Sequence, residues 1–313
     1  MKANKITKII ALILFISMLF LTTTFIMTAC GETKKDAVNL EKDREGNSIT
    51  LPDKIDKIIS IGPSNTELLV ALGVGDKIIA ADNWSSNVSG IKSDIPMLPS
   101  ITQIDGEFVI DLQPDVIIVT GMSKVGGDNP LKAVEDAGIC VIVMPSSTSI
   151  NAIKEDIRFM AAVVGADSKG KDIISDFEKE IDAIKKIGDT ITETDKKSVY
   201  FEVGQMYSLG KNTFVNEMIE LIGAKNIFAS QESWVAASEE AVLNANPDVI
   251  LTTTNYIDAP LDEIKSRPGW DVITAVKNNA VYYIDTDSSN RPNHNIVKAL
   301  KEMAKAVYPD KYN

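Results

Sequence analysis

His294 is the only histidine among the 313 residues, so imidazole chemistry has a single place to occur. It could be an axial ligand to an iron or cobalt ion, but an isolated histidine at a helix start more often lies on the surface. A triad of His294 with Asp285 or Asp287 and a serine has no motif support, because the Gly-x-Ser-x-Gly elbow and the glycine patterns of nucleotide sites are absent. A zinc or manganese site made of several histidines cannot be assembled. We therefore expect no enzyme, and we keep a surface-anchored α/β hydrolase as the less favoured alternative.

Two glutamates occupy the same place in a segment that occurs twice. Glu107 begins Glu-Phe-Val-Ile-Asp-Leu-Gln-Pro-Asp-Val-Ile, and Glu240 begins Glu-Ala-Val-Leu-Asn-Ala-Asn-Pro-Asp-Val-Ile. A second pair of related segments, 65–73 and 212–223, precedes them in the same order. Two related halves predict a duplicated domain, and hence two lobes with a cleft between them. Taken alone, each glutamate could be a solvated residue at a helix start, where negative charge is favoured.

Residues 1–29 have the layout of a secretory signal peptide. Three lysines precede an apolar run that is too short for a comfortable membrane span, and small residues stand before Cys30. Cleavage there removes three of the 32 basic residues and none of the 44 acidic ones. An exported chain with so strong an acidic excess is a poor candidate for binding nucleic acid. Cys140 has no partner except Cys30, so we expect no disulfide and interpret Cys140 as a buried apolar thiol.

Short apolar runs alternate with helical patterns along the rest of the chain. This βαβ rhythm predicts parallel sheets that are covered on both faces. Strands are expected at 57–61, 77–81, 116–119, 140–143, 198–202, 249–252 and 281–284, and helices at 66–72, 131–137, 214–222 and 296–307. Between about 150 and 187 the apolar residues recur at helical spacing, which predicts a rigid helical connector and only a small motion of the lobes. The expected organisation is a tether at 30–45, an N-terminal α/β lobe at 46–150, a connector at 151–190 and a C-terminal α/β lobe at 191–313.

The ordered set of segments resembles the cobalamin- and iron-siderophore-type substrate-binding lipoproteins of ABC importers. The resemblance is carried by residues 58–69, 107–119, 210–228, 268–270, 276–282 and 291–294. It is specific for the family and not for the ligand. It implies two Rossmann-like lobes joined by one long α-helix, no cofactor, and a transported metal chelate that is a ferric siderophore or a corrinoid, with haem as the third candidate.

The same resemblance gives roles to three residues outside the cleft. Cys30 follows Thr-Ala and precedes a polar tether, as in a lipobox, so it would be diacylated and anchor the exported protein to the outer face of the cell membrane. The alternative is cleavage elsewhere, which leaves a loose thiol. Glu107 and Glu240 would dock against arginines of a permease dimer that works with ATPase subunits, and two equivalent carboxylates match a two-fold symmetric partner. We expect the protein itself to be a monomer.

The ligand is expected at the carboxyl ends of the strands, where open α/β sheets bind ligands. The candidate residues, taken to lie on loops there, are Pro63, Ser64, Asn65, Trp84, Met122, Tyr207, Trp234 and Arg291. The three aromatic residues match ligand-facing positions of the family, and flat rings suit a corrin, porphyrin or catecholate. Arg291 matches a basic position that could meet an amide, phosphate or carboxylate. Ile101 and Met122 stand where corrinoid binders often carry rings, and Trp270 is interpreted as a structural wedge.

Overall fold

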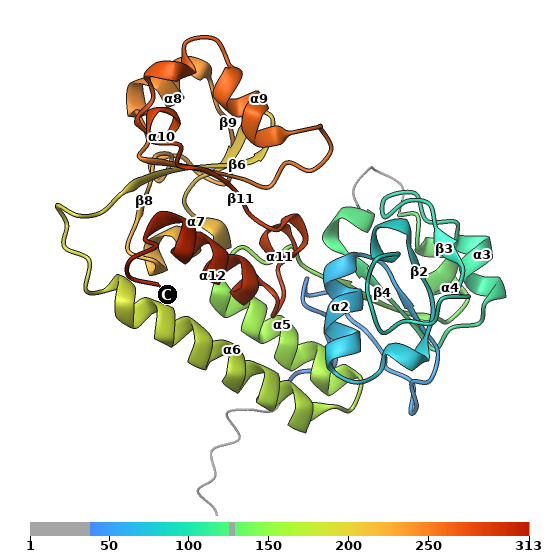
Figure 1. Cartoon of the computed structure of the whole chain (residues 1–313). Coiled ribbons are helices and arrows are strands. Elements are labelled where there is room, and N and C mark those ends of the chain that lie inside the picture. Colours follow the sequence, from blue (N-terminus) through green and yellow to red (C-terminus); the bar gives the residue numbers. More distant parts are fainter. Residues whose placement is uncertain (1–37, 125–128, 313) are drawn as a thin grey trace, which may run out of the picture. The chain divides into compact units, whose positions relative to one another are not determined.

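The first sheet is parallel throughout, as the apolar runs predicted. The computed structural model describes residues 38–124 and 129–312, and this sheet has the strand order β3-β2-β1-β4-β5 (Figure 1). Its strands are β1 (Ile58–Ser60), β2 (Ile78–Asp82), β3 (Met97–Leu98), β4 (Val116–Thr120) and β5 (Cys140–Met144). Ile59, Ile117 and Val143 lie in one apolar core, and the opposite faces of β1 and β4 are buried too. Burial on both faces explains why these strands read as unbroken apolar runs.

Three α-helices accompany the first sheet. They are α2 (Pro63–Ala71), α3 (Gly106–Asp111) and α4 (Lys132–Asp136). The turn from β1 into α2 requires glycine, because Gly62 has φ 100° and an added Cβ would lie 2.4 Å from Cγ2 of Thr120. Pro63 then begins the helix, where its fixed φ is already suitable. The prediction that residues 63–65 form a loop is therefore wrong, since they are the first turn of α2.

Two helices occupy the stretch that was assigned to the connector, α5 (Ile150–Val163) and α6 (Asp167–Gly188). They pack side by side, and Figure 1 draws α5 in light green and α6 in yellow-green. The 22 residues of α6 present a buried apolar stripe at three- and four-residue spacing, made of Ile174, Phe177, Ile181 and Ile184. The backbone of its last residue, Gly188, lies so close to α7 that an added Cβ would be 2.1 Å from the Leu221 carbonyl oxygen.

The second sheet is mixed. Its order is β11-β10-β6-β7-β9, and β8 also pairs with β6. The strands are β6 (Ser198–Gly204), β7 (Tyr207–Leu209), β8 (Lys225–Asn226), β9 (Trp234–Ala236), β10 (Val249–Thr252) and β11 (Val281–Tyr283). β7 is antiparallel to both β6 and β9. Tyr207 and Trp234, which were assigned to loops, therefore belong to short antiparallel strands.

The helices that follow in the second half are α7 (Phe214–Leu221), α8 (Glu239–Ala245), α9 (Pro260–Ser266), α10 (Thr274–Lys277), α11 (Thr286–Asn290) and α12 (Ile296–Val307). α6 contacts both α7 and α12. Trp270 is fully buried in the core of this half, in edge-to-face contact with Tyr200, as expected for a wedge. The predicted class, two α/β lobes with a long helix between them, is confirmed.

No helix within 38–124 and 129–312 is both long enough and apolar enough to cross a membrane. The predicted signal peptide at 1–29 and the predicted lipidation site, Cys30, lie outside these residues. Both stay predictions from the sequence.

Candidate functional site

A cavity of about 560 Å³ lies where both halves of the chain bring the carboxyl ends of their strands. Pro63 follows β1, residues 83–87 follow β2, and Asn255 follows β10. The lining residues are Pro63, Asn83, Trp84, Ser86, Asn87, Ile101, Asn255, Thr286, Asp287, Asn290 and Arg291. Three predicted residues, Pro63, Trp84 and Arg291, are thus brought together. We call this cavity the cleft.

Trp84 presents its indole from a rigid backbone. Its side chain is 67% exposed, whereas Asp82, two residues before it, is fully buried. The Asp82 carboxylate accepts hydrogen bonds from the Trp84 backbone N–H (2.9 Å), the Gly62 backbone N–H (2.7 Å) and the Ser85 hydroxyl (2.7 Å). These three bonds tie the turn after β2 to the turn after β1. A large exposed ring on a fixed turn is suited to stacking against a flat ligand.

Arg291 does not point a free guanidinium into the cleft. Its side chain is 12% exposed and is paired with Glu67 of α2 through Nη1 and with Asp287 through Nη2, the latter at 2.7 Å. Oε2 of Glu67 also accepts hydrogen bonds from the side-chain amides of Asn293 (2.6 Å) and Asn295 (2.9 Å). Glu67 therefore holds α2 to the 291–295 segment.

The other predicted residues lie elsewhere. Asn65 is buried and donates to the Ile61 carbonyl oxygen (2.9 Å), and Ser64 is half-buried at the start of α2. Met122, Tyr207 and Trp234 are exposed but do not line the cleft. Tyr207 pairs with Ala236, and Leu209 pairs with Trp234. In this antiparallel register the two aromatic residues are diagonal neighbours on one face, so their rings can act as a single surface.

Tyr256 was missed by the sequence reasoning, as were Asn87 and Asn255 of the cleft. Tyr256 is exposed, and its hydroxyl accepts a hydrogen bond from the Gln205 backbone N–H (2.9 Å), in the connection between β6 and β7. It comes directly after Asn255, four residues beyond the end of β10. That position was the available signal, because residues just past a parallel strand reach the ligand edge of the sheet.

A buried ion pair stabilises the connection between β6 and β7. Arg267 contacts both carboxylate oxygens of Glu202, at 2.7 and 2.9 Å, and these side chains are 7% and 1% exposed. The hydroxyl of Tyr200 donates to Glu202 at 2.9 Å, and burial raises the pKa of that hydroxyl. The backbone N–H of Met206 also points at Glu202 (3.4 Å). This network fixes the turn that leads into Tyr207.

His294 is not the surface residue that was expected. Its side chain is half-buried, its Nδ1 is buried without a hydrogen-bond partner in the described structure, and burial lowers the pKa of the ring. His294 does not line the cleft. Among the described residues, no group of three or more His, Cys, Asp or Glu side chains could hold a metal ion.

Glu107 and Glu240 occupy equivalent positions, each the second residue of its helix. Asp105 and Ser238 cap these helices with their side chains. Both glutamates are exposed, and neither makes an ion pair or side-chain hydrogen bond within the described structure. Each helix turns back through Pro-Asp into the next parallel strand, so each helix begins at the carboxyl edge of its sheet.

The aspartates of the two Pro-Asp pairs have the same structural role in both halves. Oδ2 of Asp115 accepts hydrogen bonds from the backbone N–H groups of Asp56 and Lys57, at 2.7 and 2.8 Å. Oδ2 of Asp248 accepts from the backbone N–H and the hydroxyl of Ser198, at 2.8 and 2.7 Å. Both aspartates therefore anchor the first strand of their half. The glutamates have no such structural task.

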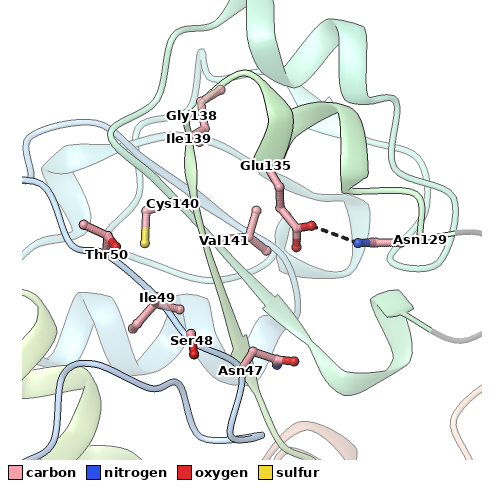
Figure 2. A pocket seen from close by; sticks show the side chains of 10 residues that line it. All are labelled: Asn47, Ser48, Ile49, Thr50, Asn129, Glu135, Gly138, Ile139, Cys140 and Val141. Atoms are coloured by element: carbon pink, nitrogen blue, oxygen red, sulfur yellow. Dashed lines mark hydrogen bonds between the residues drawn. The ribbon is translucent and has the colours of Figure 1, made fainter.

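A second cavity, of about 540 Å³, lies away from the cleft at the free edge of β5 (Figure 2). Cys140 borders it together with Thr50, and Asn129 bonds Glu135 across its rim (3.0 Å). Cys140 is half-buried and not buried as predicted, because an edge strand is covered on fewer sides than a central one. Burial still raises the pKa of this thiol, which makes it a poor nucleophile.

Comparisons with known proteins agree with this architecture. A family model described as periplasmic binding protein matches residues 58–288. An uncharacterized ABC transporter substrate-binding lipoprotein of Bacillus subtilis, YvrC, is 31% identical over 276 residues, which cover 86% of this chain and 85% of the relative. A cobalamin-binding protein of Halobacterium salinarum is 23% identical over 86% of this chain and 73% of its own length. The crystal structure of a possible iron-binding periplasmic solute-binding protein of Staphylococcus epidermidis has a TM-score of 0.71 at 28% identity, covering 82% of this chain and all of that one.

Proposed function

This chain belongs to the periplasmic binding protein family, and we propose that it captures a metal chelate outside the cell and delivers it to the permease of an ABC importer. It is a substrate-binding protein of the class that serves ABC transporters of cobalamin, siderophores and haem. The transported ligand is a ferric siderophore or a corrinoid. Export, an acyl anchor on Cys30 and a monomeric state complete the proposal. The relatives are binding proteins, and we propose no catalytic step.

One observation carries the ligand part of the proposal, namely the cleft with an exposed indole on a rigid turn. The ring is 67% exposed and its backbone is fixed by Asp82, so the backbone of the turn loses little conformational freedom when a ligand covers the ring. Tyr207 and Trp234 add a second aromatic surface on the other half of the chain. Flat chelates offer large faces to such rings.

The fluorescence of the soluble domain, from Gly31 onward, tests ligand capture. Titration with cyanocobalamin, haemin and ferric hydroxamate and catecholate siderophores should give saturable quenching with one of these classes, after correction for ligand absorbance. Trp84→Phe and Trp234→Phe should each reduce the quenching and the affinity. Trp270 lies in the core and remains as an internal reference in both variants. Quenching that survives both substitutions unchanged would place the ligand elsewhere.

For the docking role we propose Glu107 and Glu240. They are exposed, unpaired within the described residues, equivalent in the two halves and located at the edge of the sheets that also carries the cleft. Exposed carboxylates at symmetric places can orient a protein on two arginine-bearing permease subunits. The aspartates of the repeat are excluded from this role because they bond their own lobes.

Uptake of the chelate by cells, measured beside ligand affinity in solution, tests docking. Glu107→Ala combined with Glu240→Ala should abolish uptake and leave affinity within about twofold, because neither residue lines the cleft. Glu239→Ala is the matched control, since it removes the same charge one residue earlier on α8. Normal uptake by the double variant would refute the docking assignment without affecting the ligand proposal.

A further inference from the structure

The residues that line the cleft carry no net charge, since one positive and one negative side chain cancel. Of its lining residues only Arg291 and Asp287 are charged, and four of the others are asparagines. The two hydroxyls, of Ser86 and Thr286, are neutral as well. Each asparagine offers two N–H donors and one carbonyl acceptor. Among the residues that the structure places around this cavity, uncharged amides are therefore the main polar groups.

The single cation is already neutralised on both sides. Nη1 of Arg291 is paired with Glu67, and Nη2 is 2.7 Å from Asp287. Nη2 also points at the side-chain oxygen of Asn87 (3.3 Å), while the amide of Asn87 donates to Asp287 (2.8 Å). One guanidinium thus faces two carboxylates, which leaves the group as a whole with a negative charge.

Glu67 keeps the guanidinium from turning toward a ligand. It is as little exposed as Arg291, at 12%, and its second oxygen is held by Asn293 and Asn295. Removing Arg291 from this pair would leave a mostly buried carboxylate without its counter-ion, which is unfavourable. His294, beside these asparagines, supplies no compensating charge at neutral pH, because burial lowers its pKa.

We propose that Glu67 and Asp287 determine specificity: by neutralising Arg291 they make the cleft select an uncharged, amide-bearing chelate and reject polyanionic ones. This inference rests on the proposed function. Three catecholate dianions around Fe³⁺ leave a trianion, and haem carries two propionates, so both meet an acidic group in the cleft. Corrinoids carry carboxamide arms and peptide hydroxamates carry peptide amides, and either can exchange hydrogen bonds with asparagines. A carboxylate in the cleft repels an anion, most strongly where it is shielded from water as Glu67 is, while it leaves a neutral chelate almost unaffected.

Binding of four probes to the soluble domain, from Gly31 onward, tests the inference. Cyanocobalamin and ferrichrome are the uncharged probes, and ferric enterobactin and haemin are the anionic ones. We expect the wild type to bind one of the uncharged probes at least about 100-fold more tightly than either anionic probe, a difference of about 2.7 kcal/mol. Binding of cyanocobalamin would identify the ligand as a corrinoid, and binding of ferrichrome would identify it as a hydroxamate siderophore.

Glu67→Gln and Asp287→Asn each remove one carboxylate with little change of shape. Each should improve the binding of ferric enterobactin relative to the uncharged probe by about tenfold or more. Asp287→Asn is the safer variant, because Asp287 is partly exposed whereas Glu67 is packed between the halves. Asp182→Asn, an exposed change on α6, should leave the ratio unchanged.

Two outcomes overturn the inference. If ferric enterobactin or haemin binds the wild type as tightly as the uncharged probes, or if neither cleft variant changes the ratio, Glu67 and Asp287 do not set the charge preference. In both cases the proposed function stands, because a chelate is still bound. If none of the four probes binds the wild type or either variant, the proposed function fails and this inference fails with it.

Discussion

The substitution Arg267→Met should destabilise the C-terminal half severely. Arg267 is the counter-ion of Glu202, which is 1% exposed, and it contacts both of its oxygens. Without the guanidinium, the carboxylate keeps only the Tyr200 hydroxyl and the distant Met206 N–H. Removing one partner of a buried pair costs about 3–5 kcal/mol, because the other charge stays buried. Stacking of the guanidinium on Trp270, 4.6 Å from the ring centroid, is lost as well.

Urea unfolding followed by far-UV circular dichroism and by tryptophan fluorescence measures this loss. With an m value of about 3 kcal/mol/M, the midpoint of the transition that reports on Trp270 should fall by more than about 1 M. Lys132→Met is the matched control. It breaks an ion pair of the same length, 2.7 Å, but Lys132 and Asp136 are both exposed. We expect Lys132→Met to lower the free energy of unfolding by less than about 0.5 kcal/mol.

A double-mutant cycle decides whether the cause is the stranded charge. Glu202→Gln combined with Arg267→Met leaves no buried charge, so it should recover about 2 kcal/mol or more of the loss caused by Arg267→Met alone. Glu263, the second partner of Arg267, is partly exposed and can turn to solvent in each variant. If Arg267→Met costs no more than Lys132→Met, or if the double variant is less stable than Arg267→Met, this electrostatic explanation is wrong.

Three further predictions concern pH, packing and motion. Burial lowers the pKa of His294, so below the usual histidine pKa of about 6.5 the unfolded chain binds more protons than the folded one. The free energy of unfolding should therefore fall on acidification. Equal pH profiles of the urea midpoint for the wild type and His294→Gln would contradict this. Gly188→Ala should lower the free energy of unfolding by at least about 2 kcal/mol, because the new Cβ would lie 2.1 Å from the Leu221 carbonyl oxygen. Gly106→Ala is the control: a Cβ there has its nearest neighbours 3.6 Å away, so thermal unfolding should be nearly unchanged. The packed helices α5 and α6 should keep lobe motion small, and X-ray scattering with and without ligand should show a change in radius of gyration well below the several ångströms of a hinge closure.

Most of the fold could be predicted because buried parallel strands have an unmistakable composition. β4 and β10 are apolar at nearly every position since both faces are covered, and α12 was predicted with its observed ends, Ile296 and Val307. β7 and β9 were missed for the opposite reason. They have three residues each, lie toward the edge of the sheet, and carry exposed aromatics that resemble a binding loop.

The cleft could be predicted only in part. Trp84 and Arg291 stood out because each is a distinctive residue next to a strand end or a helix. The asparagines at 87 and 255 gave no signal, since asparagine is common in every turn. The pairing of Arg291 with Glu67 joins residues 224 positions apart, and no local pattern can specify it. For this reason the sequence predicted Arg291 as a basic residue available to the ligand, whereas in the structure Glu67 and Asp287 neutralise it.

The two halves share the features that the proposed permease would contact and differ in the features that would contact the ligand. The shared elements are a capped helix that starts with an exposed glutamate and a Pro-Asp turn that anchors the first strand. The elements that differ include those that form the cleft, where the first half supplies Trp84 from a short turn and the second supplies Arg291 from the segment after α11. A partner with two-fold symmetry requires equivalent contacts, but an asymmetric chelate does not. The proposed docking to a two-fold permease would therefore require the glutamates to stay equivalent, while the cleft is free to differ between the halves.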